Sequence, residues 1–122
     1  MAFRVLVIED NPWNMRLVGD ILEAAGYVFL EAADGKSGIE KALTEKPDLI
    51  LLDVMLPDMN GVQVTRQLRE ESATATLPII ALTANANDDL RVRCLEVGCT
   101  DYMTKPFTRR VLLETLQRHL PA

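Results

Sequence analysis

Five polar residues stand where apolar segments of the chain end, and together they could carry phosphoryl chemistry: Glu9, Asp10, Asp53, Thr83 and Lys105. Carboxylates that lie close together repel one another unless a cation sits between them. Hard oxygen ligands with open water positions suit Mg²⁺ far better than zinc. Lys105 offers a compact positive charge and Thr83 a hydroxyl donor, and both groups can hold a phosphoryl oxygen. With Asp53 as a carboxylate nucleophile, this set of residues predicts the formation of an acyl phosphate.

The stretch from Asp48 to Gly61 predicts how Asp53 is positioned. Residues 49–52 are an unbroken apolar run, which is typical of a short strand buried on both faces. The run ends at Asp53, and a turn-rich loop follows as far as Gly61. A charged residue at the carboxyl end of a buried parallel strand lies where open α/β sheets place their chemistry. Taken alone, Asp53 could equally be a loop residue or a helix cap.

Strand and helix patterns alternate along the whole chain. Strands are expected at 4–9, 27–32, 49–52, 77–83 and 102–103. Helices are expected from residue 12 until Gly26 stops the first, and from the turn at 34–35 until Pro47 ends the second. Further helices are expected at 61–71, at 86–97 and after Thr108, with a polar loop at 72–76. Such alternation predicts a parallel sheet covered by helices on both faces. We therefore predict an α/β, flavodoxin-like, doubly wound (βα)5 domain with strand order 2-1-3-4-5, in which the carboxyl ends of neighbouring strands one and three bring the acids together.

The composition limits the classes of function. The 122 residues, 48% hydrophobic and 25% charged, are expected to form one domain, 1–122. The formal net charge of −5 argues against direct nucleic-acid binding and gives no support to binding an anionic membrane. No apolar stretch approaches the roughly 20 residues that span a bilayer, and the start of the chain looks like a strand rather than a signal peptide, so we expect a cytoplasmic protein. Cys94 and Cys99 fit neither a disulfide framework nor a zinc pattern, and Cys94 is interpreted as a buried free thiol.

Four short motifs occur in a specific order and spacing: Val-Ile-Glu9-Asp10-Asn11, Leu-Leu-Asp53-Val-Met-Leu-Pro57-Asp-Met-Asn-Gly61, Ala-Leu-Thr83-Ala84 and Asp101-Tyr102-Met-Thr-Lys105-Pro106-Phe107. On these motifs the chain resembles, over nearly its whole length, the receiver domain of two-component response regulators. The sequence ends at Ala122 without an output domain, so we expect either a stand-alone or an excised receiver domain.

The resemblance implies that Asp53 accepts a phosphoryl group from a sensor histidine kinase or a histidine phosphotransferase. It also implies that Asp10, Asp53 and the main-chain carbonyl of Met55 bind Mg²⁺ directly, and that Glu9 acts through a metal-bound water. Position 9 holds Glu where the family more commonly has Asp. Such a protein promotes its own phosphorylation and dephosphorylation but is not a turnover enzyme.

The same resemblance gives roles to residues later in the chain. Thr83 and Lys105 would contact the phosphoryl oxygens, and a cis peptide bond before Pro106 would aim Lys105 at the site. Tyr102 would be an aromatic switch that turns inward as Thr83 moves toward the phosphate. The surface made by the fourth helix, fifth strand and fifth helix would then change, and would contact an unknown downstream protein or a second phosphorylated copy.

Residues around the expected site have further interpretations. Met55 and Asn85, each two positions past a site residue, are expected at its mouth, where they would tune the lifetime of the phosphorylated state. Trp13, Asn14 and Met15 open the first helix beside the acids. They either pack at the start of that helix or, with Trp13 and Met15 exposed, dock a helix of a kinase or phosphotransferase.

Helical periodicity also predicts which side chains face the core. Leu17 is expected inward and Arg69 outward. Arg91 and Arg93 are interpreted as solvated residues on or beside the output surface. His119, in the last turn of the last helix, is interpreted as a complement to the helix dipole.

Three other classes of function share part of this sequence pattern. A flavin-binding flavodoxin shares the fold, but Glu9 and Asp10 would repel the flavin phosphate after strand one. A haloacid-dehalogenase-type phosphatase wants a second Asp two residues past the nucleophile, where this chain has Met55. A phosphate-independent scaffold would be expected to have lost one of the site residues, and all of them are present.

Overall fold

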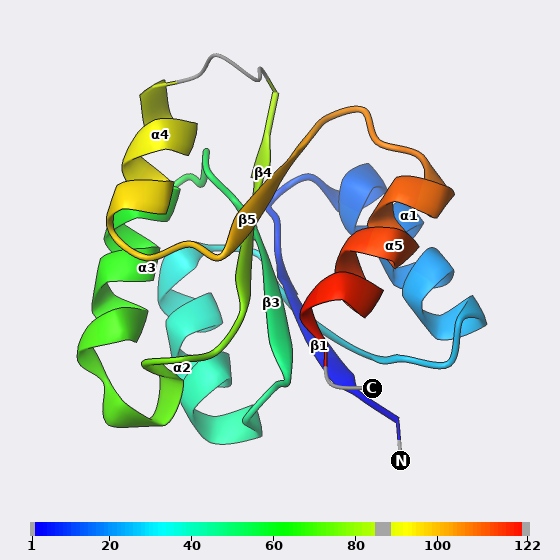
Figure 1. Cartoon of the computed structure of the whole chain (residues 1–122), viewed down its shortest axis with the longest axis horizontal. Coiled ribbons are helices and arrows are strands. Elements are labelled where there is room, and N and C mark those ends of the chain that lie inside the picture. Colours follow the sequence, from blue (N-terminus) through cyan, green and yellow to red (C-terminus); the bar gives the residue numbers. More distant parts are fainter. Residues whose placement is uncertain (1, 85–88, 121–122) are drawn as a thin grey trace.

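The computed structural model describes residues 2–84 and 89–120, and it contains a five-stranded sheet (Figure 1). The strands are β1 (Arg4–Ile8), β2 (Val28–Ala32), β3 (Leu49–Asp53), β4 (Ile79–Thr83) and β5 (Asp101–Thr104). Their order is β2-β1-β3-β4-β5 and every neighbouring pair is parallel, which confirms the predicted topology. The chain leaves β1 and β3 toward opposite faces of the sheet, so the topological switch point lies between the carboxyl ends of these two strands.

Helices cover both faces of the sheet. They are α1 (Pro12–Ala24), α2 (Gly35–Glu45), α3 (Gly61–Glu70), α4 (Asp89–Glu96) and α5 (Arg109–His119). Figure 1 shows α1 and α5 together on one side, and α2, α3 and α4 on the other. All five residues of β3 are buried, because alternate side chains enter the two apolar clusters: Leu49 and Leu51 on the α1–α5 side, Ile50 and Leu52 on the α2–α4 side.

Short-range signals set several helix ends. Asn11 caps α1 by accepting hydrogen bonds from the backbone N–H groups of Trp13 and Asn14, with Pro12 at the first helical position. Thr108 caps α5 in the same way, at 3.1 Å from the nitrogen of Val111. These caps fall where the sequence predicted them, because a cap needs only residues within one turn.

Element boundaries differ from the prediction in a few places. β4 begins at Ile79 instead of residue 77, and the expected polar loop at 72–76 contains a 3₁₀ turn, Ser72–Thr74. β5 extends one residue beyond the predicted pair on each side. α4 is described from Asp89, and the predicted start of this helix at residue 86 lies outside the described residues.

The orientation of α1 contradicts the prediction for Leu17 and decides between the two interpretations of Met15. Leu17, predicted to face the core, is 59% exposed, whereas Met15, considered as an exposed docking residue, is buried. Trp13 is 83% exposed, as that docking interpretation requires. The placement of α1 on the sheet decides which of its residues face the core. A periodic apolar pattern predicts this buried face only to within about one residue.

Two further polar residues make contacts that the sequence did not predict. Arg69 is half-buried rather than outward, and its guanidinium donates to the carbonyls of Gly98 and Thr74, which ties α3 to the segment before β5. His119 lies in the last turn of α5, as predicted, and it also contacts another element: its Nε2 is 2.8 Å from Asp101 Oδ2 at the start of β5. No helix in the described parts of the chain has the length and apolar character to cross a bilayer.

Candidate phosphoacceptor and metal site

The acids predicted to converge do so at the carboxyl ends of β1 and β3. Ile8 and Leu52 are register partners, so the residues that follow them leave the sheet side by side. Glu9, Asp10 and Asp53 each offer a carboxylate oxygen, and these oxygens all lie within 4.8 Å of one another. Glu9 and Asp53 are buried and Asp10 is exposed, so the cluster opens to solvent on one side.

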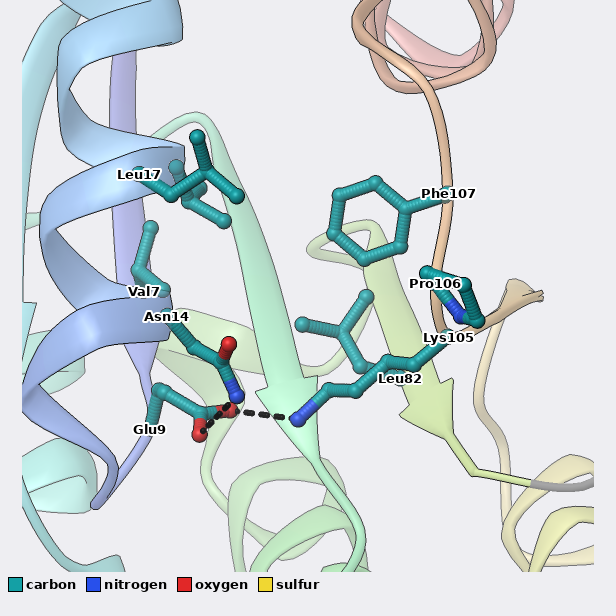
Figure 2. A pocket seen from close by; sticks show the side chains of 9 residues that line it. Val7, Glu9, Asn14, Leu17, Leu82, Lys105, Pro106 and Phe107 are labelled. Carbon is teal, nitrogen blue, oxygen red and sulfur yellow. Dashed lines mark hydrogen bonds and ion pairs between the residues drawn. The ribbon is translucent and has the colours of Figure 1, made fainter.

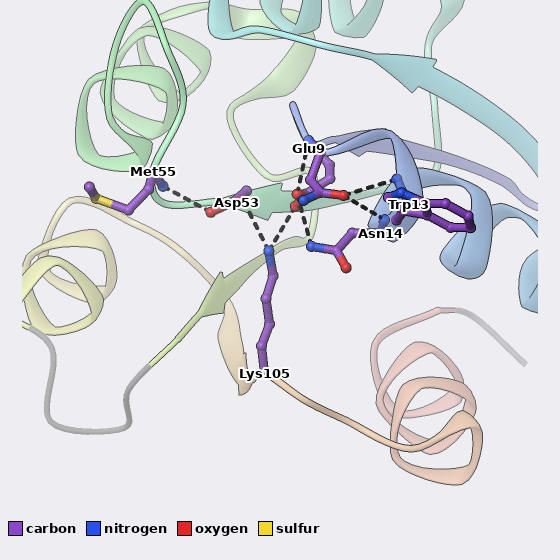
Figure 3. A network of polar contacts seen from close by, with 7 residues as sticks. Glu9, Trp13, Asn14, Asp53, Met55 and Lys105 are labelled. Carbon is purple, nitrogen blue, oxygen red and sulfur yellow. Dashed lines mark hydrogen bonds and ion pairs between the residues drawn. The ribbon is translucent and has the colours of Figure 1, made fainter.

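Lys105 reaches the same point from the segment after β5. Its Nζ lies 2.9 Å from Glu9 Oε2 and 3.0 Å from Asp53 Oδ2, and Figure 3 shows the ammonium between the two carboxylates. The remaining Asp53 oxygen, Oδ1, accepts a hydrogen bond of 2.9 Å from the backbone nitrogen of Met55. The Asp53 carboxylate is therefore held in one orientation from both sides.

Glu9 is fixed by a second set of donors that the sequence did not indicate. Its Oε1 accepts from the backbone nitrogen of Asn11 and from the Nδ2 of Asn14, both at 3.3 Å. Asn14 was predicted only as a packing or docking residue, whereas its amide also lies against the acidic cluster (Figure 3). A polar residue one turn into the helix that follows a site strand is the signal that could have suggested this contact.

Burial and the neighbouring charged groups shift two pKa values in the cluster upward. Burial raises the pKa of Glu9, and the neighbouring Asp53 carboxylate raises it further, while Lys105 opposes the change. Burial alone would lower the pKa of Lys105, but its bonds to Glu9 and Asp53 outweigh this and leave the pKa above its ordinary value. The ammonium therefore stays charged at neutral pH and serves as the counter-charge of the buried acids.

The donor set fits a hard divalent cation. Oxygens bound to one octahedral Mg²⁺ are about 3.0 Å apart in neighbouring positions and about 4.2 Å apart in opposite positions. The three carboxylates span a similar distance, and the exposed position of Asp10 leaves room for water ligands. Glu9, Asp10 and Asp53 could thus hold Mg²⁺, and the backbone carbonyl of Met55 remains a predicted further ligand.

The two residues of the predicted switch lie on one face of the sheet. Thr83 is fully buried at the end of β4, and Tyr102 on β5 is a register partner of Ala81, two residues before Thr83. Alternation along the strands therefore places both side chains toward the α2–α4 side. Tyr102 is half-exposed and packs against the edge of that apolar cluster.

Three other predicted residues complete the surroundings. Met55 is 63% exposed, next to Asp53, as expected for a residue at the mouth of the site. The Lys105–Pro106 peptide bond is cis, as predicted. Asn85 lies outside the described residues.

Asp58, in the loop after β3, has a role that the sequence did not reveal. Its two carboxylate oxygens accept from the backbone nitrogens of Gly35 and Lys36, at 2.8 and 3.0 Å, in the first turn of α2. These bonds lower the pKa of Asp58. The carboxylate thus joins the loop beside the site to the start of α2, a helix distant in sequence.

A pocket of about 260 Å³ lies beside the acidic cluster, between α1 and the segment that joins β5 to α5. Figure 2 shows Leu17 and Phe107 on opposite sides of its apolar part, and Glu9, Asn14 and Lys105 at its polar end. The exposed Leu17 is therefore part of an apolar surface that leads to the site.

Comparisons with known proteins agree with this geometry. A family model for the response regulator receiver domain matches residues 5–117. The chain belongs to this family. The flavodoxin-like fold and the class of function predicted from the sequence are confirmed, and the haloacid-dehalogenase alternative is not favoured.

Individual relatives of this receiver domain differ in length. The alkaline phosphatase synthesis transcriptional regulatory protein PhoP of Bacillus subtilis is 45% identical over 110 residues, which cover 90% of this chain and 45% of PhoP. The polar-differentiation response regulator DivK of Brucella anthropi is 36% identical over 122 residues, 98% of each protein. The chain therefore spans about half the length of some relatives and nearly all of others.

A solved receiver domain gives a structural comparison. The receiver domain of the sensor histidine kinase PA1611 of Pseudomonas aeruginosa matches with a TM-score of 0.92 and 39% identity, over 98% of each chain. That structure has a magnesium ion coordinated in its active-site cleft. The acidic cluster of the present receiver domain has the ligand chemistry for the same ion.

Proposed function

We propose that Asp53 is the phosphoacceptor and takes a phosphoryl group from a phosphohistidine of a sensor kinase or histidine phosphotransferase. The observation that carries this proposal is the placement of the Asp53 carboxylate, 3.0 Å from Lys105 Nζ and within 4.8 Å of Glu9 and Asp10 oxygens. An Asp53 oxygen attacks phosphorus, the phosphorus–nitrogen bond breaks, and its electron pair returns to the imidazole, which takes up a proton. Lys105 moves from the carboxylate to a phosphoryl oxygen as charge passes to the new group.

Asp10, Asp53 and the Met55 carbonyl would hold Mg²⁺, with Glu9 acting through a bound water. The ion would supply charge neutralisation for the attacking carboxylate and the phosphoryl oxygens. The protein's own share is orientation, because the bonds from Met55 and Lys105 fix the Asp53 carboxylate before the donor arrives. It would act as a phosphoacceptor that promotes its own phosphorylation and dephosphorylation, not as a turnover enzyme.

Intact mass spectrometry tests the phosphoacceptor. Treatment with acetyl phosphate and Mg²⁺ should add roughly 80 Da, the mass of one phosphoryl unit on a nucleophilic carboxylate. Asp53→Asn should abolish the gain, and Asp20→Asn, a matched change of an exposed acid outside the cluster, should keep it. An adduct that persisted in Asp53→Asn would move the site elsewhere.

We further propose that the phosphodonor protein docks on α1 and on the segment between β5 and α5. Trp13 and Leu17 are exposed there, and the pocket between Leu17 and Phe107 could receive an apolar side chain beside the site (Figure 2). Leu17→Asp should slow transfer from a phosphorylated histidine phosphotransferase and leave phosphorylation by acetyl phosphate unchanged. Val92→Asp, a matched change at an exposed position on α4, should slow neither reaction.

Phosphorylation would be read on the surface of α4, β5 and α5. The phosphoryl group would draw the hydroxyl of Thr83, and Tyr102 would turn into the space that Thr83 leaves. The partner of that surface would be a downstream protein or a second phosphorylated copy of the chain.

A further inference from the structure

Arg91 lies over the residue proposed as the switch. Its guanidinium carbon is 4.4 Å from the centre of the Tyr102 ring, a distance at which a cation is attracted to the ring face. Arg91 is in the first turn of α4 and Tyr102 is on β5, so the contact joins two elements of the proposed output surface. No sequence pattern indicates this contact, and the sequence alone predicts a solvated Arg91.

The position of Arg91 is not explained by hydrogen bonding. Its Nε is buried and has no hydrogen-bond partner among the residues that the structure describes. Burying a charged donor without a partner is unfavourable, so another interaction must offset that cost. The contact with Tyr102 is the attraction that the described structure shows at this end of the side chain.

The contact depends on the orientation of the ring. Tyr102 is half-exposed at the edge of the apolar cluster, with the guanidinium over it. If the ring turned into the space beside Thr83, the guanidinium would lose its partner and Arg91 could return to solvent. We propose that Arg91 is a positioning residue that holds Tyr102 in its outward orientation and thereby opposes activation; this inference rests on the switch proposed above.

The Tyr102 ring would be in equilibrium between an outward orientation in the resting state and an inward orientation in the activated state. A ligand that binds the activated state better gains apparent affinity when the resting state loses a stabilising contact. Beryllofluoride with saturating Mg²⁺, a stable mimic of an aspartyl phosphate, is the probe, and isothermal titration calorimetry gives its affinity. Arg91→Gln should bind it roughly two- to fivefold more tightly than the wild type, the factor expected for a cation–π contact at a partly exposed site. Arg91→Lys, which keeps a cation, should fall between the two.

Arg93→Gln is the matched control, because Arg93 is an exposed arginine of the same helix with no described contact to Tyr102. It removes the same charge and should not tighten binding. In a Tyr102→Leu background, Arg91→Gln should cause no further change, because the ring through which Arg91 acts is gone. Thermal melts of each variant show whether the fold is kept. The ratio of beryllofluoride affinities between Tyr102→Leu and the Tyr102→Leu/Arg91→Gln double variant isolates the effect of Arg91, because both proteins carry the same change at Tyr102.

The outcomes separate this inference from the function on which it rests. Wild-type protein that bound no beryllofluoride would overturn both. Wild-type binding with unchanged or weaker binding by Arg91→Gln would overturn only the role of Arg91. If Arg91→Gln tightened binding equally in the Tyr102→Leu background, or if Arg93→Gln tightened binding as much as Arg91→Gln, the effect would come from charge alone. Either result would also overturn the role of Arg91.

Discussion

Lys105 Nζ lies 3.0 Å from Asp53 Oδ2, although the two residues are 52 positions apart in the chain. The same ammonium lies 2.9 Å from Glu9, so one cation neutralises part of a buried acidic cluster. Lys105 and a bound Mg²⁺ would therefore both act as counter-charges for the same carboxylates, and each should matter more when the other is missing.

Lys105→Met should lower the melting temperature in metal-free buffer, because it leaves buried carboxylates without their counter-charge. Mg²⁺ should restore much of the loss, so the increase on adding Mg²⁺ should exceed the wild-type increase by about 2–5 °C. Thermal melts in chelator and in Mg²⁺ measure both quantities. Lys36→Met, at an exposed position, is the control, and an equal Mg²⁺ response in Lys105→Met and wild type would contradict the expectation.

Asp10→Ala should remove most of the Mg²⁺-dependent rise in melting temperature. The wild type should gain stability from Mg²⁺, because the ion would bind the folded cluster and relieve repulsion among its carboxylates. The comparison uses the same melts, with Asp20→Ala as a change of an acid outside the cluster. A full Mg²⁺ response in Asp10→Ala would place the metal elsewhere.

Thr83→Ala should still accept phosphate on Asp53 but should transmit the change poorly. Its hydroxyl is the proposed link between the phosphoryl group and Tyr102, and the two side chains lie on one face of the sheet. NMR shift changes after phosphorylation should reach Tyr102 and α4 in the wild type and fade beyond the Asp53 loop in the variant. Wild-type shifts confined to that loop would refute the proposed switch.

Met55→Asn should shorten the lifetime of the phosphorylated state. Met55 is an exposed apolar side chain beside Asp53, suited to shield the phosphoryl group, whereas an amide could hold the attacking water. One neutral hydrogen bond contributes about 1 kcal/mol, so we expect hydrolysis to be roughly fivefold faster. Loss of phosphate from purified protein in Mg²⁺ measures the rate, with Asn85→Ala predicted to slow it. An unchanged or slower rate in Met55→Asn would show that Met55 does not guard the site.

Asp58→Asn should destabilise the protein at neutral pH and have less effect in acid. The pKa of Asp58 is lowered in the folded state by the N–H groups of Gly35 and Lys36. Its ionised form therefore stabilises the fold above the unfolded pKa of about 3.9, and this contribution is lost as the pH falls through the lower folded value. Melting temperatures of both proteins from about pH 7 to about pH 3 should converge. A constant gap over that range would mean that the carboxylate charge is not what matters.

The local features of the fold could be read from the sequence. The apolar run before Asp53, the cap at Asn11 with Pro12, and the cap at Thr108 all act within a few residues, so pattern and composition determine them. Strict alternation of strands and helices then predicted the sheet order, because crossover handedness and burial leave few arrangements. Convergence of Glu9, Asp10 and Asp53 followed from that order alone.

What the sequence left open depended on distance and on helix orientation. The bonds from Lys105 to Glu9 and Asp53 span 96 and 52 positions, and those that Asp58 accepts from the first turn of α2 span 23 and 22. Periodicity carries no record of such pairs, because each one depends on how separate elements are placed in space. The rotation of α1 against the sheet likewise decides that Leu17 is exposed and Met15 buried. The rotation of α4 decides that the guanidinium of Arg91 lies over Tyr102. The sequence alone therefore determined which groups meet at the sheet edge, and the tertiary structure decided which of them bind one another.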